Sequence, residues 1–132
     1  MKKTKFNELK DIYQTLHSPK GCMWDRKQTH RSILNDLKEE VEEFIEAVKN
    51  NDTRQMEEEL GDILLHVMFQ AQIAQKRKKF DIEDVISVLI KKIKRRHPHV
   101  FGNLKVRNTR QIISNWNKIK LAEKKSKQKK SK

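Results

Sequence analysis

The sequence predicts an all-α protein, and three observations support this fold class. The 132 residues include only three glycines and two prolines, so few turns are expected. Apolar residues recur three or four positions apart in five successive segments, which is the spacing of amphipathic helices. No segment alternates apolar and polar residues over a useful length, so no strand is predicted. We therefore expect a helical bundle.

The first two predicted helices are separated by a loop. The apolar residues of the first helix are Phe6, Leu9, Ile12, Tyr13 and Leu16. Pro19 and Gly21 end this helix, and residues 19–30 are expected to form the loop. Thr29 or Ser32 is the expected N-cap of the second helix, because a hydroxyl oxygen accepts a hydrogen bond from the first turn. The apolar residues of the second helix are Leu34, Leu37, Val41, Phe44 and Val48.

Three further helices are predicted. The third begins near Thr53 and ends in a basic run, a composition favoured at a helix C-terminus. Its apolar residues are Met56, Leu60, Ile63, Leu64, Val67, Ala71 and Ala74. Asp81 is the expected cap of a fourth helix that Pro98 bounds, and Thr109 opens the last helix. Because the turn near residues 50–53 is short, the second and third helices should pack antiparallel.

The charge of the chain is strongly positive and unevenly distributed. The net charge is +13, with 31 Lys and Arg residues. From Lys124 onward the sequence contains only Lys, Ser and Gln, so we expect a disordered tail at 123–132 and a folded domain at 1–122. The tail is either a solvated terminus or a weak anchor for nucleic acid. The single Cys22 and the lack of a long apolar run predict a cytoplasmic protein without membrane spans.

Acidic residues gather in the second and third predicted helices. Between residues 39 and 62 there are ten acids and two bases. Glu40 and Glu43 flank one apolar stripe, and Glu59 and Asp62 flank the next. Four carboxylates brought together cannot all ionise without a counter-charge, and hard oxygen ligands favour Mg²⁺ or Mn²⁺. The alternative is a solvated acidic helix face.

A metal held by carboxylates often recruits a substrate that carries phosphate groups. The fourth helix supplies the cations for such a substrate: Lys91, Lys92, Lys94, Arg95 and Arg96. These cations are otherwise explained as an exposed helix end favoured by the macrodipole. Trp24 and Trp116 are suited either to stacking on a base or to packing in the core.

These motifs, in this order, resemble those of the MazG-type nucleoside triphosphate pyrophosphohydrolases. The matching motifs are C-M-W-D at 22–25, Q-T-H at 28–30, E-E-x-x-E at 39–43, E-E-L-G-D-I-L-L at 58–65, R-R-H-P-H-V-F-G at 95–102 and N-W-x-x-I-K at 115–120. The resemblance covers roughly residues 6–122. Met23 departs from the family pattern, which has proline at this position.

The resemblance implies a dimeric all-α fold, Mg²⁺ dependence, and conversion of a nucleoside triphosphate or deoxynucleoside triphosphate to the monophosphate and pyrophosphate. The hard oxygen ligands allow Mn²⁺ as a substitute. The resemblance further implies roles for individual residues. The implied metal ligands are Glu40, Glu43, Glu59 and Asp62. The residues expected to bind nucleotide are Lys92, Arg95, Arg96, Trp116, Trp24 and Asp25. Glu39 or Glu43 is expected to take the proton from the attacking water.

Two other functions stay open at this point. One is a basic helical protein that binds nucleic acid, with tight binding that weakens steeply with salt and needs no Mg²⁺. The other is a regulatory protein that binds nucleotide without turnover. Retention of all four carboxylates argues against the regulatory protein, because binding alone tolerates their loss. The acidic clusters argue against nucleic-acid binding, because they would repel a polyanion unless they held metal.

Overall fold

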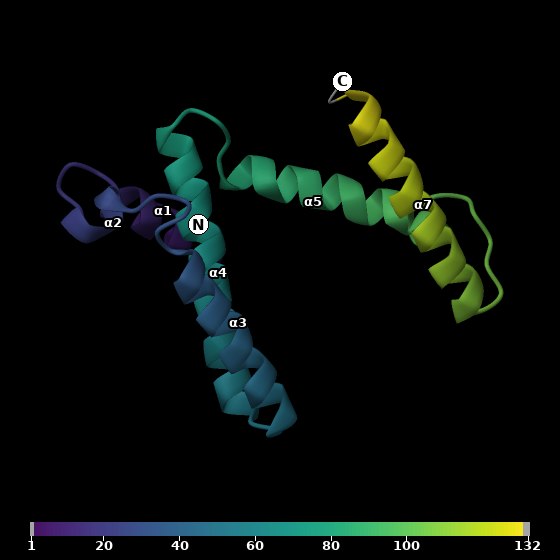
Figure 1. The fold of residues 1–132 in the computed structure, drawn as a ribbon, viewed down its shortest axis with the longest axis horizontal. Coiled ribbons are helices and arrows are strands. Elements are labelled where there is room, and N and C mark those ends of the chain that lie inside the picture. The colour runs from purple at the N-terminus through teal and green to yellow at the C-terminus, as the bar shows by residue number, and fades with distance from the viewer. Residues whose placement is uncertain (1, 131–132) are drawn as a thin grey trace. The chain divides into compact units, whose positions relative to one another are not determined.

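The computed structural model describes residues 2–130, and within this range it contains helices and no strands (Figure 1). The helices are α1 (Lys5–Leu16), α2 (Met23–Lys27), α3 (Leu34–Lys49), α4 (Thr53–Lys76), α5 (Ile82–Arg96), α6 (Pro98–Phe101) and α7 (Thr109–Lys130). The all-α prediction is confirmed. The chain divides into two compact units, Met1–Ile82 and Glu83–Lys132. None of the described helices has both the length and the apolar character needed to cross a membrane.

The segment between α1 and α3 contains a short helix that the sequence analysis missed. We predicted a loop at 19–30, whereas α2 occupies Met23–Lys27. A helix of five residues is too short to show a helical period, so pattern analysis treats it as loop. Gly21 makes the preceding turn possible, since a Cβ atom at this position would lie 2.2 Å from the Leu16 carbonyl oxygen.

The start of α3 also differs from the prediction. The N-cap is Ile33, which is only 1% exposed and provides no side-chain cap. Thr29 and Ser32 instead cap each other: the Thr29 amide donates to Ser32 Oγ (2.9 Å), and the Ser32 amide donates to Thr29 Oγ1 (3.1 Å). The two hydroxyls therefore stabilise the turn before α3 rather than its first turn.

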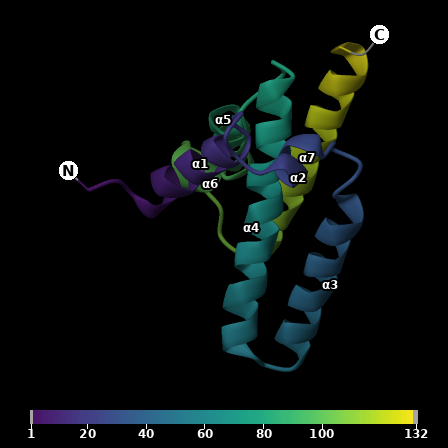
Figure 2. The same cartoon turned by 90° about the vertical axis from the view of Figure 1, so that its left-hand side faces the viewer.

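Helices α3 and α4 form an antiparallel hairpin, as predicted, and lie side by side in Figure 2. Asn51 allows the tight connection, because its φ of 54° is a left-handed conformation that asparagine tolerates better than most residues. Asp52 then caps α4 by accepting a hydrogen bond from the Gln55 amide (3.1 Å). These contacts fix how the two helices face each other.

The core of the first unit is centred on the second half of α4. Phe69 is 4% exposed, and the rings of Tyr13, His17 and Trp24 surround it at centroid distances of 5.1 to 6.2 Å. The buried apolar residues are Tyr13, Ile33, Ala47, Met68, Phe69, Ala71, Ile73, Ala74 and Ile82. Gln70 ties the segment before α3 to α4 by donating to the His30 carbonyl oxygen (3.1 Å).

Much of the predicted apolar stripe in the hairpin is exposed rather than buried. Val41 and Val48 on α3 and Leu60, Leu64 and Val67 on α4 are 38 to 51% exposed. Ile45, which was not part of the predicted stripe, lies between the two valines on α3 and is 46% exposed. Along the same stretch of α4, Glu59 and His66 are buried instead of these residues. The hairpin therefore presents an apolar face that no described residue of the first unit covers.

The second unit consists of α5, α6 and α7, and it departs from the prediction in two places. Helix α6, a four-residue helix with Pro98 at its start, was not predicted from the sequence. We expected disorder from residue 123 onward, whereas helix α7 continues to Lys130. Lysine and glutamine are good helix formers, which allows the helix to extend this far. Residues 131–132 of the expected tail lie outside the described residues, and the domain limit at 122 stays a prediction.

Candidate functional site

Three of the four predicted metal ligands converge in the helical hairpin. Glu40 and Glu43 lie one turn apart on α3, and Glu59 lies on α4. Each residue offers a carboxylate oxygen, and the three oxygens are within 4.8 Å of one another. The antiparallel packing of α3 and α4 produces this cluster, which we call the carboxylate cluster.

The carboxylate cluster contains buried oxygens without hydrogen-bond partners. Glu59 is only 3% exposed; its Oε1 accepts a hydrogen bond from the Gln55 side-chain amide, while its Oε2 has no partner. Glu40 Oε2 is buried without a partner as well. Burying an unpaired carboxylate oxygen is costly unless a cation or a proton compensates it. The donor set consists of hard oxygens, which fits Mg²⁺ or Mn²⁺.

The closeness of the carboxylates changes their proton affinity. The adjacent Glu59 carboxylate is the largest cause that raises the pKa of Glu40 to about 8, followed by burial, and the charge of Asp62 adds to this effect. The closeness of Glu59 is also the largest cause that raises the pKa of Glu43. Without a cation, the carboxylate cluster therefore retains a proton that an ordinary glutamate would lose near pH 4.5.

The other acidic residues named from the sequence lie beside the carboxylate cluster. Asp62 is half-buried on α4, and its charge acts on Glu40, but its carboxylate is not among the three that converge. Glu39 is exposed on α3, and its charge acts on Glu43. His66, also on α4, is 6% exposed, and its Nδ1 has no hydrogen-bond partner.

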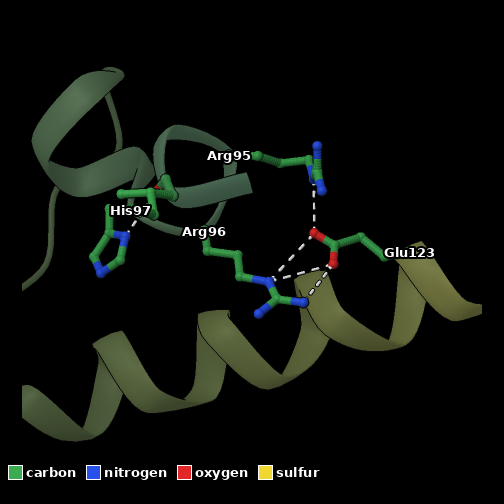
Figure 3. A network of polar contacts seen from close by, with 5 residues as sticks. Arg95, Arg96, His97 and Glu123 are labelled. Atoms are coloured by element: carbon green, nitrogen blue, oxygen red, sulfur yellow. Dashed lines mark hydrogen bonds and ion pairs between the residues drawn. The ribbon is translucent and has the colours of Figure 1, made fainter. Parts of the chain in front are cut away.

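Two of the predicted nucleotide-binding residues, Arg96 and Trp116, meet in the second unit. Figure 3 shows Arg96 with the neighbouring Arg95, His97 and Glu123. The Arg96 guanidinium carbon lies 5.2 Å from the centroid of the Trp116 ring. The His97 ring packs edge-on against Trp116 at 5.0 Å and donates from Nδ1 to the Ile93 carbonyl oxygen (2.7 Å). Lys92 is half-buried one turn before Arg96 and therefore lies on the same face of α5.

Glu123 pairs with both predicted phosphate-binding arginines, a contact that the sequence analysis missed. Arg95 Nε donates to Glu123 Oε2 (2.7 Å), and an Arg96 terminal nitrogen donates to Oε1 (2.8 Å). These bonds, with Arg96 contributing most, lower the pKa of Glu123 to about 2. Glu123 is the only acid among the lysines after residue 118, and this isolation is the one sequence signal that pointed to it.

Trp24 and Asp25, the remaining predicted nucleotide-binding residues, belong to the first unit. Trp24 is 55% exposed and contacts Phe69 edge-on at 6.1 Å. Asp25 is half-buried, and its negative charge acts on Tyr13 and His17. Burial is the main cause that raises the pKa of Tyr13 to about 12, and Asp25 adds to it. Asp25 therefore faces the aromatic core around Phe69.

The raised pKa of Glu40 predicts how stability depends on pH in metal-free buffer. Between pH 4.5 and about 8 the folded state binds more protons than the unfolded state, because Glu40 keeps its proton in the fold. The stability that this bound proton contributes is therefore lost as pH rises through this range. Glu40→Gln should therefore be more stable than the wild type above pH 8, by roughly 2–4 °C in Tm, and similar to it near pH 4. Thermal denaturation in EDTA from pH 4 to 9 measures this difference.

The control for this measurement is Glu42→Gln, which changes an exposed glutamate on the same helix outside the carboxylate cluster. The difference in Tm between Glu42→Gln and the wild type should stay the same from pH 4 to pH 9. If Glu40→Gln and Glu42→Gln gave the same pH profile, the proposed repulsion within the carboxylate cluster would be contradicted.

Comparison with known proteins connects this geometry to a family. Residues 28–101 match the model of the MazG nucleotide pyrophosphohydrolase domain, so the match includes the carboxylate cluster. The nucleoside triphosphate pyrophosphohydrolase/pyrophosphatase MazG of Thermotoga maritima is 51% identical over 119 residues, which are 90% of this chain and 45% of that protein. The nucleoside triphosphate pyrophosphohydrolase of Escherichia coli K12 is 37% identical over 118 residues, covering 89% of this chain and 45% of that protein.

A solved structure agrees with this match. The crystal structure of a MazG-related protein from Thermotoga maritima superposes with a TM-score of 0.70 at 32% identity, covering 87% of this chain and 97% of that one. The chain spans less than half the length of the curated relatives that it matches. Family model, relatives and fold agree, and the chain belongs to the MazG nucleotide pyrophosphohydrolase domain family.

Proposed function

We propose that this protein hydrolyses nucleoside triphosphates to the monophosphate and pyrophosphate, using a divalent cation held by the carboxylate cluster. The observation that supports this most is the pair of buried, unpartnered oxygens of Glu40 and Glu59 beside Glu43. The family description and the names of the relatives supply the reaction class. Asp62 is proposed as the fourth ligand because its charge already acts on Glu40.

The proposed reaction breaks the bond between the α and β phosphates. Glu40, Glu43, Glu59 and Asp62 would hold Mg²⁺, which would supply positive charge to neutralise phosphate oxygens and the leaving pyrophosphate. Glu39 or Glu43 accepts the proton that the attacking water releases, and the water oxygen forms the new bond to phosphorus. Lys92, Arg95 and Arg96 are proposed to bind phosphate groups, since arginine pairs with phosphate through two parallel hydrogen bonds. Trp116 and Trp24 offer flat surfaces for a base.

Loss of single carboxylates tests the proposed reaction. Glu43→Gln and Asp62→Asn should each lower the turnover of nucleoside triphosphate by roughly 100-fold or more, because the cation supplies several kcal/mol of charge stabilisation. Helix content measured by circular dichroism should not change. Phosphorus NMR of the reaction mixtures, with Mg²⁺ and with EDTA, identifies the products and gives the rates.

Glu42→Gln is the matched control, because Glu42 is exposed on α3 and is not part of the carboxylate cluster. It should retain the activity of the wild type. Normal turnover in both Glu43→Gln and Asp62→Asn would contradict the proposed metal site. Binding of nucleic acid that fades with salt, with no hydrolysis at all, would favour the nucleic-acid-binding alternative instead.

We further propose that the apolar face of the hairpin binds a second copy of the chain. Val41, Ile45 and Val48 recur at helical spacing on α3, and Leu60 and Leu64 do so on α4. Exposed apolar residues that form a continuous stripe mark interaction surfaces, and soluble homo-oligomers are most often twofold dimers. The stripe lies on the same two helices as the carboxylate cluster, so dimer formation would also hold the hairpin together.

Ile45→Lys should convert the dimer to a monomer, because the interface would then bury an unpaired ammonium group. Size-exclusion chromatography with light scattering measures the mass across a tenfold concentration range. Asn35→Lys adds the same charge at an exposed α3 position outside the stripe and should leave the mass unchanged. A wild-type protein that is monomeric at every concentration would contradict the proposed dimer.

The contact of Glu123 with Arg95 and Arg96 predicts an effect on substrate affinity. Phosphate groups and the Glu123 carboxylate compete for the same guanidinium donors. Glu123→Gln removes the competing charge and should lower the KM for nucleoside triphosphate by roughly threefold to tenfold with little change in kcat. Steady-state kinetics at fixed Mg²⁺ measures both constants, and an increase in KM would show that Glu123 positions the arginines instead.

A further inference from the structure

A pocket lined by basic residues lies at the end of α4 that is far from the carboxylate cluster. Its volume is ≈ 330 Å³, and its lining includes His17, Arg26, Lys27, Lys76 and Arg77. Ile73, also in the lining, is fourteen residues beyond Glu59 on α4, which corresponds to about 21 Å along a helix. We call this site the basic pocket. It is distinct from the carboxylate cluster.

The basic pocket concentrates positive charge that no described acid neutralises. Arg26 and Lys27 come from α2, Lys76 from the last turn of α4, and Arg77 is the C-cap of α4. None of the four forms an ion pair within residues 2–130. Arg26 Nε is buried without a hydrogen-bond partner. The charge of Asp25 acts on His17 in the same lining.

His17 contributes an unpartnered polar group to the same pocket. It is 7% exposed, and both its ring nitrogens are buried without hydrogen-bond partners. The ring is held in place by stacking on Tyr13 at 6.4 Å and by an edge contact with Phe69 at 5.1 Å. A neutral imidazole carries one N–H donor and a charged one carries two, so this ring always offers a donor. Buried polar groups in proteins are normally paired, so the two His17 ring nitrogens are available to a group that enters the pocket.

The helix macrodipole explains only part of this arrangement. Cations are favoured in the last turn of a helix, and this accounts for Lys76 and Arg77 at the end of α4. It does not account for Arg26 and Lys27, which α2 brings to the pocket from about fifty residues earlier in the chain. Nor does it account for the buried donor of His17.

We propose that the basic pocket binds the terminal phosphate group of a small molecule, such as pyrophosphate or a nucleotide. Arginine, lysine and imidazole donors directed at one pocket match the several acceptor oxygens of a terminal phosphate. The pocket is concave and its His17 donor is buried, which suits a small anion better than the continuous backbone of a nucleic acid. This site is separate from the proposed catalytic site, and binding to it requires neither metal nor turnover.

Calorimetric titration of the full chain with pyrophosphate in EDTA tests this proposal, because metal-free carboxylates repel phosphate. The variant Lys76→Gln/Arg77→Gln removes two cations that line the pocket and should weaken binding by roughly tenfold or more. Lys78→Gln/Lys79→Gln removes the same charge from the next two residues, which do not line the pocket, and should change binding by less than about twofold. Circular dichroism checks that both variants are folded.

Proton NMR of the His17 ring locates the bound anion independently. Burial lowers the pKa of His17, and Lys76 adds to this effect while Asp25 opposes it, so a bound anion should raise the pKa. Adenosine monophosphate and pyrophosphate, added separately, show whether nucleotide or pyrophosphate is preferred.

Four results would overturn the proposal. Two concern the titration: no binding of pyrophosphate in EDTA, or the same loss of affinity in both double variants. The third is a His17 ring whose NMR signals do not change when the anion is added. The fourth is a single-stranded oligonucleotide that competes with pyrophosphate equally well, counted per phosphate group. Because hydrolysis is measured with Mg²⁺ in a separate assay, failure of this proposal would be distinguishable from failure of the proposed reaction.

Discussion

Repulsion among Glu40, Glu43 and Glu59 is the constraint on which the rest of the first unit depends. The packing of α3 against α4 holds three carboxylate oxygens within 4.8 Å, two of the residues keep a buried oxygen without a partner, and a proton remains on the cluster to an unusually high pH. The hairpin stays closed because the Asn51 turn, the Asp52 cap and the core around Phe69 fix α4 elsewhere. A cation that replaces the proton would then stabilise the fold as well as take part in the chemistry.

Helix α4 carries opposite charges at its two ends. Acids dominate its first half, where Glu59 faces α3, whereas Lys76 in its last turn and the C-cap Arg77 are cations that line a pocket with residues of α2. One end is therefore suited to a cation and the other to an anion, although the net charge of the chain is +13. In the second unit the charges are paired locally instead, since Glu123 binds both Arg95 and Arg96. The net charge of the chain therefore does not predict the local charge at any of these sites.

The sequence predicted the features that depend on helical period and missed those that depend on distant contacts. The long helices, the antiparallel hairpin and the carboxylate spacing could be read from residues three and four apart. Helices α2 and α6 are too short to show a period. The Glu123 pair and the basic pocket join residues 27 or more positions apart, which one sequence without relatives does not reveal. The exposed hairpin stripe was assigned to the core because period identifies an apolar face but not what covers it.

The most direct test of the central claim is a calorimetric titration of the protein with Mn²⁺ at pH 7. Repeating it in two buffers with different ionisation enthalpies counts the protons released on binding. Because the pKa of Glu40 is raised to about 8, binding should release close to one proton in the wild type. The account predicts that Glu59→Gln weakens binding and releases fewer protons. Absence of Mn²⁺ binding, or binding without proton release, would contradict the claim that a cation replaces the proton shared by these carboxylates.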